Sequence, residues 1–497
     1  MEALLSGLRE AGQAVVQMLS LPYFYIALLL VWWHEAQTVK LQRKLFHVRM
    51  RGSLSVALMR LGAGMLAGIG LSIAGFGAGS ALTPETLLCV WAAMVLLVLF
   101  RFRFICLAYA AGLLGVLQAV LNAVPVPDGL DGAGLAVWNA IQGIDVPGLL
   151  FLAGLLHIAE GLLVRLQGAK TAFPLFLEGK RGKPIGAHAL SGVWPIPLLW
   201  LVPASGTDGF ALPWTPLFGG DGDSAALWSL IAFPVVIGFS DRTETYWPEQ
   251  KAKDSGNRLI VFGVILAALS AGAVYWPPLA AAASVAALVL HEGLLWISRL
   301  GEAGRQPLYV QDGTGVRILA VLPGSPAAEM GLMAGETIRK ANGAATRTKE
   351  ELHAALQRQS AFSKMEVANR EGHLKFPQRA RYAGEHHQLG LILAPDEEAD
   401  FVAAARPGSI WQMLRNAGAR KRGGPALAEF GAAGPEQAAS VDGVGSQEAA
   451  NESAALPLDP DNVPAEPTAG PAQPSGAASG PAQADQGLPP RRSRKPG

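Results

Sequence analysis

Two short segments of the chain place histidine and glutamate close together in apolar surroundings, and these residues could do chemistry. Imidazole and carboxylate groups bind metal ions and relay protons. Neither segment has the His-Glu-x-x-His spacing that sets two histidines one helical turn apart on a zinc ion. We therefore interpret both as interfacial helix ends or as remnants of an internal repeat, and we predict no catalytic residue, no metal and no cofactor. The residues weighed here are His157, Glu160, His291 and Glu292.

The composition divides the chain into an apolar part and a polar part. Apolar residues make up 51% of the chain and charged residues only 16%, whereas a typical globular domain has about 25% charged residues. This balance excludes a wholly soluble enzyme and a collagen-like chain. The two cysteines, Cys89 and Cys106, both lie in apolar runs, so we interpret them as small buried side chains rather than as a disulfide or a zinc site. The net charge of +1 gives no sign of nucleic-acid binding.

Apolar runs follow one another through the first 300 residues, and nine of them approach the length that a membrane-crossing helix needs. We predict an amphipathic segment over residues 1–18 and a transmembrane helical domain over 19–299. The sixth and seventh runs are short and contain or adjoin prolines, so the count falls to seven or eight if they are broken or re-entrant. The runs are Leu19–Trp33, Leu54–Phe76, Thr86–Phe100, Phe104–Val124, Val146–Leu163, Ala189–Val202, Ala225–Phe239, Leu259–Tyr275 and Leu279–Ile297.

The loops between these runs alternate in charge. The odd-numbered loops carry lysine and arginine, and the even-numbered loops carry none. Because basic loops stay in the cytoplasm, we expect the N-terminus outside and everything after Arg299 inside. Within the second run, Arg60 lies near the cytoplasmic end and is expected to reach the interface. Gly64 and Gly68 have the spacing that lets another helix approach closely.

From about Tyr309 the pattern changes to short strands, tight turns and two short helices. A buried strand begins at Val316, and Ser325 is placed to cap a short helix that ends at Gly331. Asn342-Gly343 is a strong turn signal, and Thr348 with Glu351 has the spacing of a capping box. This run resembles a bacterial PDZ domain in Val321-Leu-Pro-Gly-Ser-Pro-Ala-Ala, Gly331-Leu, Ala334-Gly-Glu-Thr-Ile and Asn342-Gly, with Glu336 where an aspartate is usual.

The PDZ resemblance implies a small α/β fold over residues 305–395, a partly open β-barrel with two helices. Such domains bind an extended peptide by strand addition beside a helix. Leu389-Gly390-Leu391 looks like the carboxylate-binding turn of the circularly permuted bacterial form. The alternative is that Gly390 only permits a bend and that the leucines are core residues. The implied groove residues are Leu389, Gly390, Leu391, Leu393, Leu352, His353 and Leu356.

The fold class predicted for the whole chain is therefore a polytopic α-helical membrane bundle followed by a PDZ domain. Residues 396–497 are rich in alanine, glycine and proline and are expected to be a disordered tail. This layout suits a protease, a transporter or a scaffold. No protease motif is found, and the proline-rich sixth and seventh runs are all that favours a transporter. A scaffold is preferred.

The chain also resembles the MinJ family of membrane proteins, which act in Gram-positive division-site selection. The resemblance covers about residues 15–395. It implies a septal and polar membrane scaffold that bridges a DivIVA-like polar coiled-coil protein to a MinD-like ATPase. Apart from this resemblance, contact with membrane lipid is expected, and self-association is left open. The similar segments are Gln42-Arg-Lys-Leu-Phe-His-Val-Arg, Arg103-Phe-Ile-Cys-Leu-Ala-Tyr-Ala-Ala-Gly-Leu-Leu-Gly, Glu160-Gly-Leu-Leu, Phe176-Leu-Glu-Gly-Lys-Arg-Gly-Lys and His387-Gln-Leu-Gly-Leu-Ile-Leu.

Overall fold

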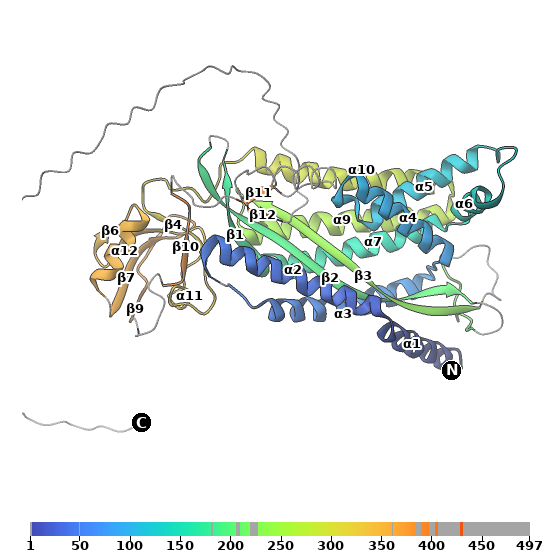
Figure 1. The fold of residues 1–497 in the computed structure, drawn as a ribbon, viewed down its shortest axis with the longest axis horizontal. Coiled ribbons are helices and arrows are strands. Elements are labelled where there is room, and N and C mark those ends of the chain that lie inside the picture. Colours follow the sequence, from blue (N-terminus) through green and yellow to red (C-terminus); the bar gives the residue numbers. More distant parts are fainter. Residues whose placement is uncertain are drawn as a thin grey trace, which may run out of the picture. The chain divides into compact units, whose positions relative to one another are not determined.

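A computed structural model describes most of the first 396 residues of the chain. The described residues are 2–48, 50–179, 182–204, 209–218, 227–359, 361–380, 382 and 389–396, with two short strands at 403–405 and 428–430. The predicted disordered tail lies almost wholly outside them. Figure 1 shows the order of the elements along the chain.

Apolar helices make up most of the first 303 residues, and they confirm the predicted helical bundle. Within the described residues, α3, α9, α10 and the helix that begins with α7 are long and apolar enough to cross a membrane. The pair α1 and α2, bent by 64°, would make a fifth span, and α4 and α5 are shorter apolar helices. The bounds are α1 Glu2–Ser20, α2 Pro22–Phe46, α3 Ser53–Ala78, α4 Pro84–Phe100, α5 Leu107–Ala123, α6 Gly132–Gln142, α7 Val146–Leu163, α9 Pro248–Tyr275 and α10 Pro278–Ala303. A 3₁₀ turn, Phe102–Phe104, precedes α5, and α7 continues through a π-helical turn, Val164–Gly168, into α8, Ala169–Thr171.

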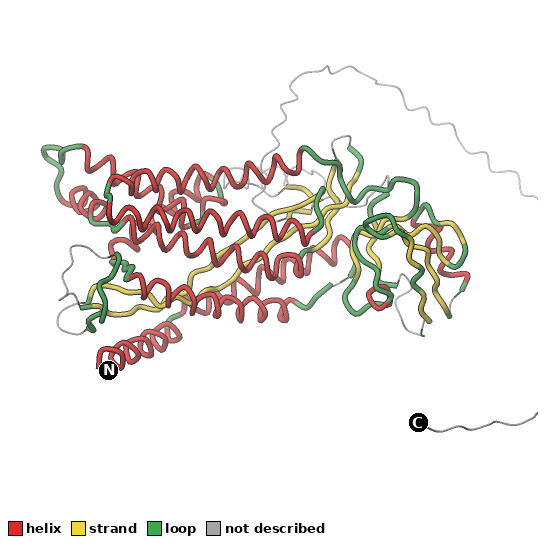
Figure 2. Tube along the Cα trace, turned by 180° about the vertical axis from the view of Figure 1, so that it is seen from behind, coloured by secondary structure: helices red, strands yellow, loops and turns green. Residues whose placement is uncertain are grey.

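The sixth and seventh predicted spans are strands rather than helices, so that part of the prediction is wrong. Strand β2, Pro184–Pro203, pairs antiparallel with β3, Trp228–Thr243, from His188 opposite Thr243 to Pro203 opposite Trp228. Strand β1, Phe173–Glu178, pairs with the start of β2 on its other side. Figure 2 shows the hairpin strands running lengthwise among the helices.

The prolines of β2 explain why this run forms a strand. In a helix interior, each proline would remove a hydrogen bond and clash with the preceding turn. In the strand, the carbonyl and ring of Pro195 face Gly64 of α3, and those of Pro197 face Gly68. The N–H and C=O of one strand residue point to the same side of the strand. Because the carbonyls of both prolines face α3, the N–H groups that proline lacks would also have faced α3 and not the paired strand β3. The prolines therefore cost the sheet no hydrogen bond.

The two glycines of α3 therefore serve a purpose different from the one expected. A Cβ at Gly64 would collide with the Pro195 carbonyl, and one at Gly68 with the Pro197 carbonyl. The spacing predicted a neighbouring helix, whereas the neighbour is a strand. Close approach of backbones is the common requirement, and glycine meets it in both cases.

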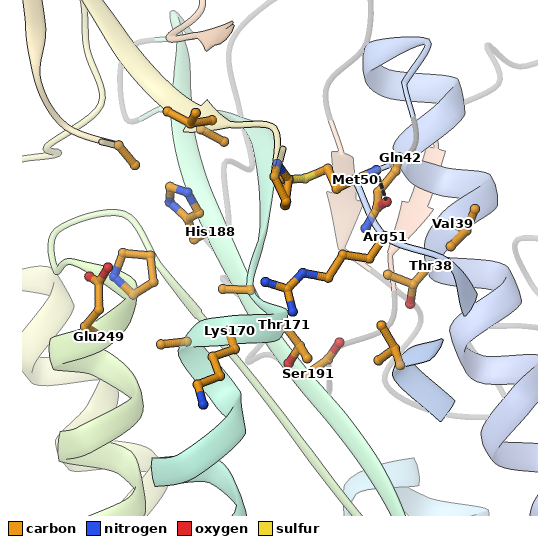
Figure 3. A pocket seen from close by; sticks show the side chains of 18 of the residues that line it. Thr38, Val39, Gln42, Met50, Arg51, Lys170, Thr171, His188, Ser191 and Glu249 are labelled. Carbon is orange, nitrogen blue, oxygen red and sulfur yellow. Dashed lines mark hydrogen bonds between the residues drawn. The ribbon is translucent and has the colours of Figure 1, made fainter. Parts of the chain in front are cut away.

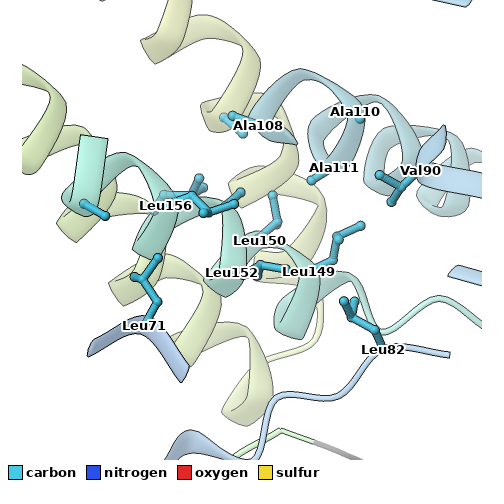
Figure 4. Packing of buried hydrophobic residues seen from close by; sticks show 14 of the residues in the cluster. Leu71, Leu82, Val90, Ala108, Ala110, Ala111, Leu149, Leu150, Leu152 and Leu156 are labelled. Carbon is cyan, nitrogen blue, oxygen red and sulfur yellow. The ribbon is translucent and has the colours of Figure 1, made fainter. Parts of the chain in front are cut away.

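Helix α7 lies at the centre of the bundle. A Cβ at Gly161 would be 2.6 Å from the Gly256 carbonyl, and one at Gly154 would be 2.8 Å from the Gly263 carbonyl. Small residues seven apart on both α7 and α9 thus let the two backbones touch. Figure 4 shows the α7 leucines, from Leu149 to Leu156, packed toward Leu71 and Ala108.

Arg60 is buried inside the bundle, so the expectation that it reaches the interface is wrong. Its side chain is 2% exposed. It forms an ion pair with Glu35 of α2, and its Nη2 donates to the Ser191 carbonyl oxygen of β2 at 2.6 Å. A buried charge must be paired, and here the pairing ties α2, α3 and β2 together.

The PDZ region forms the strands, turns and helices that the sequence predicted. Ser325 Oγ accepts a hydrogen bond from the Ala328 N–H at 3.3 Å, and Thr348 Oγ1 accepts one from the Glu351 N–H at 3.2 Å. The main sheet has the order β10-β4-β5-β7-β8, with β6 on β5 and β9 on β7. The bounds are β4 Val316–Val321, α11 Pro326–Glu329, β5 Thr337–Ala341, β6 Ala344–Ala345, α12 Lys349–Arg358, β7 Phe362–Ala368, β8 Leu374–Lys375, β9 Gln378–Ala380 and β10 Leu391–Leu393. A separate parallel pair joins β11, Ala403–Ala405, to β12, Ala428–Phe430.

Candidate functional site

The edge strand β10 and the helix α12 are the elements that a peptide groove would need. Strand β10 pairs with β4, with Leu391 opposite Val321, and stands at the end of the sheet formed by the described residues. Helix α12 packs on the same hydrophobic core as β10 through Leu352 and Leu356. An open strand edge beside a helix is the arrangement that accepts an added strand.

The predicted groove residues divide into a buried set and a partly exposed set. Leu389 and Leu391 are 0% and 7% exposed, and Leu352 and Leu356 are both 3% exposed. All four belong to the core cluster of the domain, whereas Leu393 and His353 are partly exposed. The buried leucines can therefore form only the floor of a groove. Leu393 and His353 are the predicted residues best placed to touch a ligand.

The turn before β10 explains the glycine at position 390. Leu389 and Gly390 have φ values of 56° and 78°, in the left-handed region that favours glycine. The Ala327 N–H donates to the Leu389 carbonyl at 3.0 Å, and the Leu322 N–H donates to the Gly390 carbonyl at 2.9 Å. A Cβ on Gly390 would collide with the Ser325 side chain. The fold itself thus requires this glycine, whether or not a ligand approaches it.

The other end of β10 lies near the start of α12. Burial raises the pKa of Asp396, and the neighbouring Glu350 raises it further, while Lys349 opposes the shift. Glu350 and Lys349 belong to the first turn of α12, so the charges that act on Asp396, three residues after β10, come from the start of that helix. Asp396 thus lies on the side of the domain where α12 begins, within electrostatic reach of Glu350 and Lys349.

The opposite face of the PDZ sheet packs against the bundle. Ile392 of β10 and Leu319 of β4 join a hydrophobic cluster with Phe46, Phe176 and Trp247 from the membrane part. The segment before β4 adds backbone contacts. The Gly186 N–H donates to the Tyr309 carbonyl at 2.9 Å, and the Leu308 N–H donates to the Glu244 carbonyl at 2.8 Å. The domain is thus docked on the bundle through its sheet.

Trp247, just before α9, is the main anchor of this contact. The guanidinium of Arg370 lies over its ring, and Arg370 also pairs with Glu249 at 3.5 Å. Gly335 has a φ of +91°, and a Cβ there would run into the Trp247 ring. The indole is therefore held between a glycine and an arginine of the PDZ domain.

A cavity of about 270 Å³ borders the docking contact. Its walls come from α2, α8, β2 and the start of α9, together with Val321 and Pro323 next to the Gly390 turn. Figure 3 shows the Arg51 side chain extending into the cavity, with Lys170 on its wall. The Met50 N–H donates to Gln42 Oε1 at 3.3 Å. The cavity lining thus carries charges of both signs, since Glu35 and Glu249 line it together with Arg51 and Lys170.

Comparison with known proteins gives the same two-part division. The PDZ domain family matches residues 317–367. The "Cell division topological determinant MinJ" of Bacillus subtilis (strain 168) is 28% identical over 389 residues, which cover 77% of this chain and 95% of that protein. The "Probable cell division topological determinant MinJ" of Lacticaseibacillus paracasei is 27% identical over 265 residues, or 50% of this chain and 66% of that protein. No solved structure matches the chain. The resemblance to MinJ proteins and to PDZ domains, inferred from the sequence, is confirmed.

Proposed function

We propose that this chain is a membrane scaffold of cell-division site selection, in which a docked PDZ domain binds an extended segment of a partner protein. The observation that carries the proposal is the extent of the similarity to the Bacillus protein. It covers 95% of that protein and 77% of this chain, so it extends well beyond the PDZ domain into the membrane part. The relative's name describes a topological determinant of division, and we transfer that role to this chain.

The docked domain suits a scaffold because it is held at a fixed place on the bundle. Strand addition to β10 supplies backbone hydrogen bonds, so the ligand needs few side-chain contacts. A complex of micromolar affinity, about −8 kcal/mol, is sufficient for a contact repeated on many molecules at one membrane site. Leu393 and His353 would contact the ligand over a floor of Leu389, Leu391, Leu352 and Leu356.

The partners follow from the resemblance to MinJ proteins. One is a DivIVA-like coiled-coil protein that marks the pole or septum, and the other is a MinD-like ATPase of the division-inhibitor system. Bridging them requires the PDZ domain and the C-terminal end to face the cytoplasm, as the basic loops predict. Replacement of two predicted spans by a hairpin removes an even number of helices, so this orientation is retained.

The scaffold is proposed to act by binding and not by catalysis. The sequence-based support for a transporter came from the sixth and seventh runs as broken helices. Those runs form β2 and β3 instead, and that support is lost.

Localisation of a fluorescent full-length fusion in dividing cells tests the proposal. We expect enrichment at septum and poles, which Leu393→Lys and His353→Glu should each reduce to an even membrane signal. His373→Glu, on an exposed residue of the β7–β8 turn, is the matched control and should localise like the wild type. Immunoblots of membrane fractions establish equal amounts of each variant. An even signal for the wild type would refute the division role, and septal enrichment of both groove variants would refute the groove.

A further inference from the structure

Three side chains with metal-binding atoms meet where helices α5, α7 and α10 come together. They are Cys106 at the start of α5, His157 in α7 and His291 in α10. Cys106 Sγ lies 3.3 Å from His157 Nε2 and 3.7 Å from His291 Nε2. The three potential ligand atoms all lie within 4.8 Å of one another. The two histidines are those singled out from the sequence, whereas the cysteine was interpreted there as a small buried side chain.

Hydrogen bonds to the other ring nitrogens fix both imidazoles in the same tautomer. His157 Nδ1 lies 2.7 Å from the Ala153 carbonyl oxygen, which can only accept, so Nδ1 carries the hydrogen. Tyr109 Oη donates to Glu292 Oε1 at 2.7 Å. The phenol oxygen can then accept from His291 Nδ1 at 3.0 Å. Each neutral ring therefore directs the lone pair of its Nε2 atom at Cys106.

The two Nε2 atoms each need a hydrogen-bond donor, but the site offers only one hydrogen. That hydrogen belongs to the Cys106 thiol, and it can be donated to one imidazole nitrogen at a time. The second nitrogen is left without a donor, which is costly in a site where His157 is 2% exposed. A cation at the centre would satisfy all three atoms at once. Zinc bonds of about 2.3 Å to sulfur and about 2.0–2.1 Å to nitrogen, at tetrahedral angles, place sulfur and nitrogen about 3.5 Å apart. The two separations found here lie on either side of that value.

We propose that Cys106 Sγ, His157 Nε2 and His291 Nε2 bind one zinc ion, with the fourth position open to water. On binding, the thiol releases its proton to solvent and its sulfur bonds the metal as thiolate, while both imidazoles stay neutral. Two nitrogens and one thiolate suit zinc better than calcium or magnesium, which prefer oxygen ligands. The carbonyl behind His157 and the Tyr109–Glu292 pair behind His291 are the outer-shell partners that metal-bound histidines usually have.

The site is partly open to solvent on one side and closed by an aromatic ring on the other. Cys106 and His291 are partly exposed, and Glu292 forms an ion pair with Arg103 at 2.9 Å on the same side. On the inner side, the Phe262 ring lies 4.9 Å from the His157 ring and 5.5 Å from the His291 ring. A bound ion would add a further link among three helices that already pack closely at small residues such as Gly112 and Gly115.

The test uses the full-length protein in detergent, stripped of metal with a chelator and titrated with Co²⁺ and then Zn²⁺. We expect one Co²⁺ per chain, with a cobalt–thiolate charge-transfer band that one Zn²⁺ abolishes. Cys106→Ser should remove the band, and Cys106→Ser, His157→Ala and His291→Ala should each weaken Zn²⁺ binding at least about 100-fold. Tyr109→Phe removes only an outer-shell contact, so it should cost about 10-fold.

Matched controls separate the site from general effects. Cys89→Ser alters the other cysteine of the chain and should bind metal like the wild type, as should His373→Ala in the PDZ domain. If a ligand variant fails to fold, the site is tested instead by the rate at which Cys106 is alkylated in the Cys89→Ser protein. Bound Zn²⁺ should slow this alkylation. A wild type without the charge-transfer band, a Cys106→Ser protein that binds Zn²⁺ as tightly, or a Cys106 alkylated equally fast with Zn²⁺ would each overturn the proposal.

Discussion

The guanidinium carbon of Arg370 lies 4.4 Å from the centre of the Trp247 ring. Arg370 belongs to the turn after β7 in the PDZ domain, and Trp247 to the segment that begins helix α9. Because Gly335 leaves room for the indole on the same domain, the two parts fit against each other at a specific place. The PDZ domain is therefore fixed to the bundle by a defined contact as well as by the chain that follows α10.

Removing this contact should loosen the domain. Arg370→Ala should cost about 1 kcal/mol, the usual value of a cation–π contact at a partly exposed site, and Gly335→Val should cost more because its side chain would meet the indole. We expect faster proteolysis in the segment 304–315 for both variants. Arg339→Ala, on an exposed residue of β5, is the control. Equal cleavage rates for Arg370→Ala, Gly335→Val and Arg339→Ala would contradict the docking.

The glycines of α3 allow a matched comparison within one helix. Gly64→Ala should destabilise the full-length protein by about 1–3 kcal/mol, because its Cβ meets the Pro195 carbonyl and the core cannot make room for it. A Cβ at Gly62 would meet nothing within 4 Å. Gly62→Ala should therefore be neutral or stabilise by up to about 1 kcal/mol through helix propensity. Thermal unfolding in detergent measures both, and an equal loss in the two variants would argue against packing of α3 on β2.

Removing one charge of the buried ion pair between Arg60 and Glu35 should destabilise the protein more than removing both. Glu35→Gln leaves a buried guanidinium without its counter-charge and should cost about 3–5 kcal/mol. Adding Arg60→Met removes that charge as well, so the double variant should recover much of the loss. Arg258→Met, at a partly exposed position of α9 where Arg258 pairs with Asp254 at 3.8 Å, should change stability by less than about 1 kcal/mol. A double variant less stable than Glu35→Gln would show that the charges do not act as a pair.

His188 should make the docking contact sensitive to acid. Its pKa is lowered to about 3, mainly by burial; a backbone hydrogen bond with Leu319 opposes this shift, and the charge of Arg370 adds to it. The Tyr309 ring lies 4.7 Å from the imidazole. Since the pKa in the folded protein is below the unfolded value of about 6.5, the unfolded state binds the proton more tightly.

The contribution of neutral His188 to the free energy of unfolding is therefore complete above about pH 6.5 and is lost as the pH falls toward about 3. Within that range, the free energy of unfolding should fall by up to about 1.4 kcal/mol for each unit of pH. Melting temperatures of the wild type and His188→Asn between pH 4 and 8 measure it, with His373→Asn as the exposed-histidine control. Identical pH profiles for His188→Asn and the wild type would rule out this histidine as the cause.

The PDZ domain could be predicted from the sequence because its signals are local. Ser325, Thr348 and Asn342-Gly343 each determine a cap or turn through atoms a few residues away, and the structure has those caps. The role of Gly390 was harder to predict. Its tight neighbour is Ser325, some 65 positions earlier in the chain, and no spacing rule reveals such a contact.

The hairpin of β2 and β3 could not be recognised from apolar content alone. A strand that is buried on both faces reads as a continuous apolar run, like a buried helix. The alternation Trp194-Pro-Ile-Pro was the available signal, because two prolines at that spacing are incompatible with a helix interior. The convergence of Cys106 with His157 and His291 was also hidden, since the three residues lie on three helices and share no sequence motif.

Strand β2 has a mechanical consequence. Near its start, the Gly186 N–H bonds the Tyr309 carbonyl beside the PDZ domain, and near its end the Leu201 carbonyl accepts from the Leu82 N–H between α3 and α4 at 3.0 Å. A strand of 20 residues at about 3.3 Å per residue is roughly 65 Å long, about twice the thickness of a membrane's hydrocarbon core. Because one continuous strand joins these two contacts, we expect a displacement of the turn between α3 and α4 to be transmitted along β2 to the place where the PDZ domain docks.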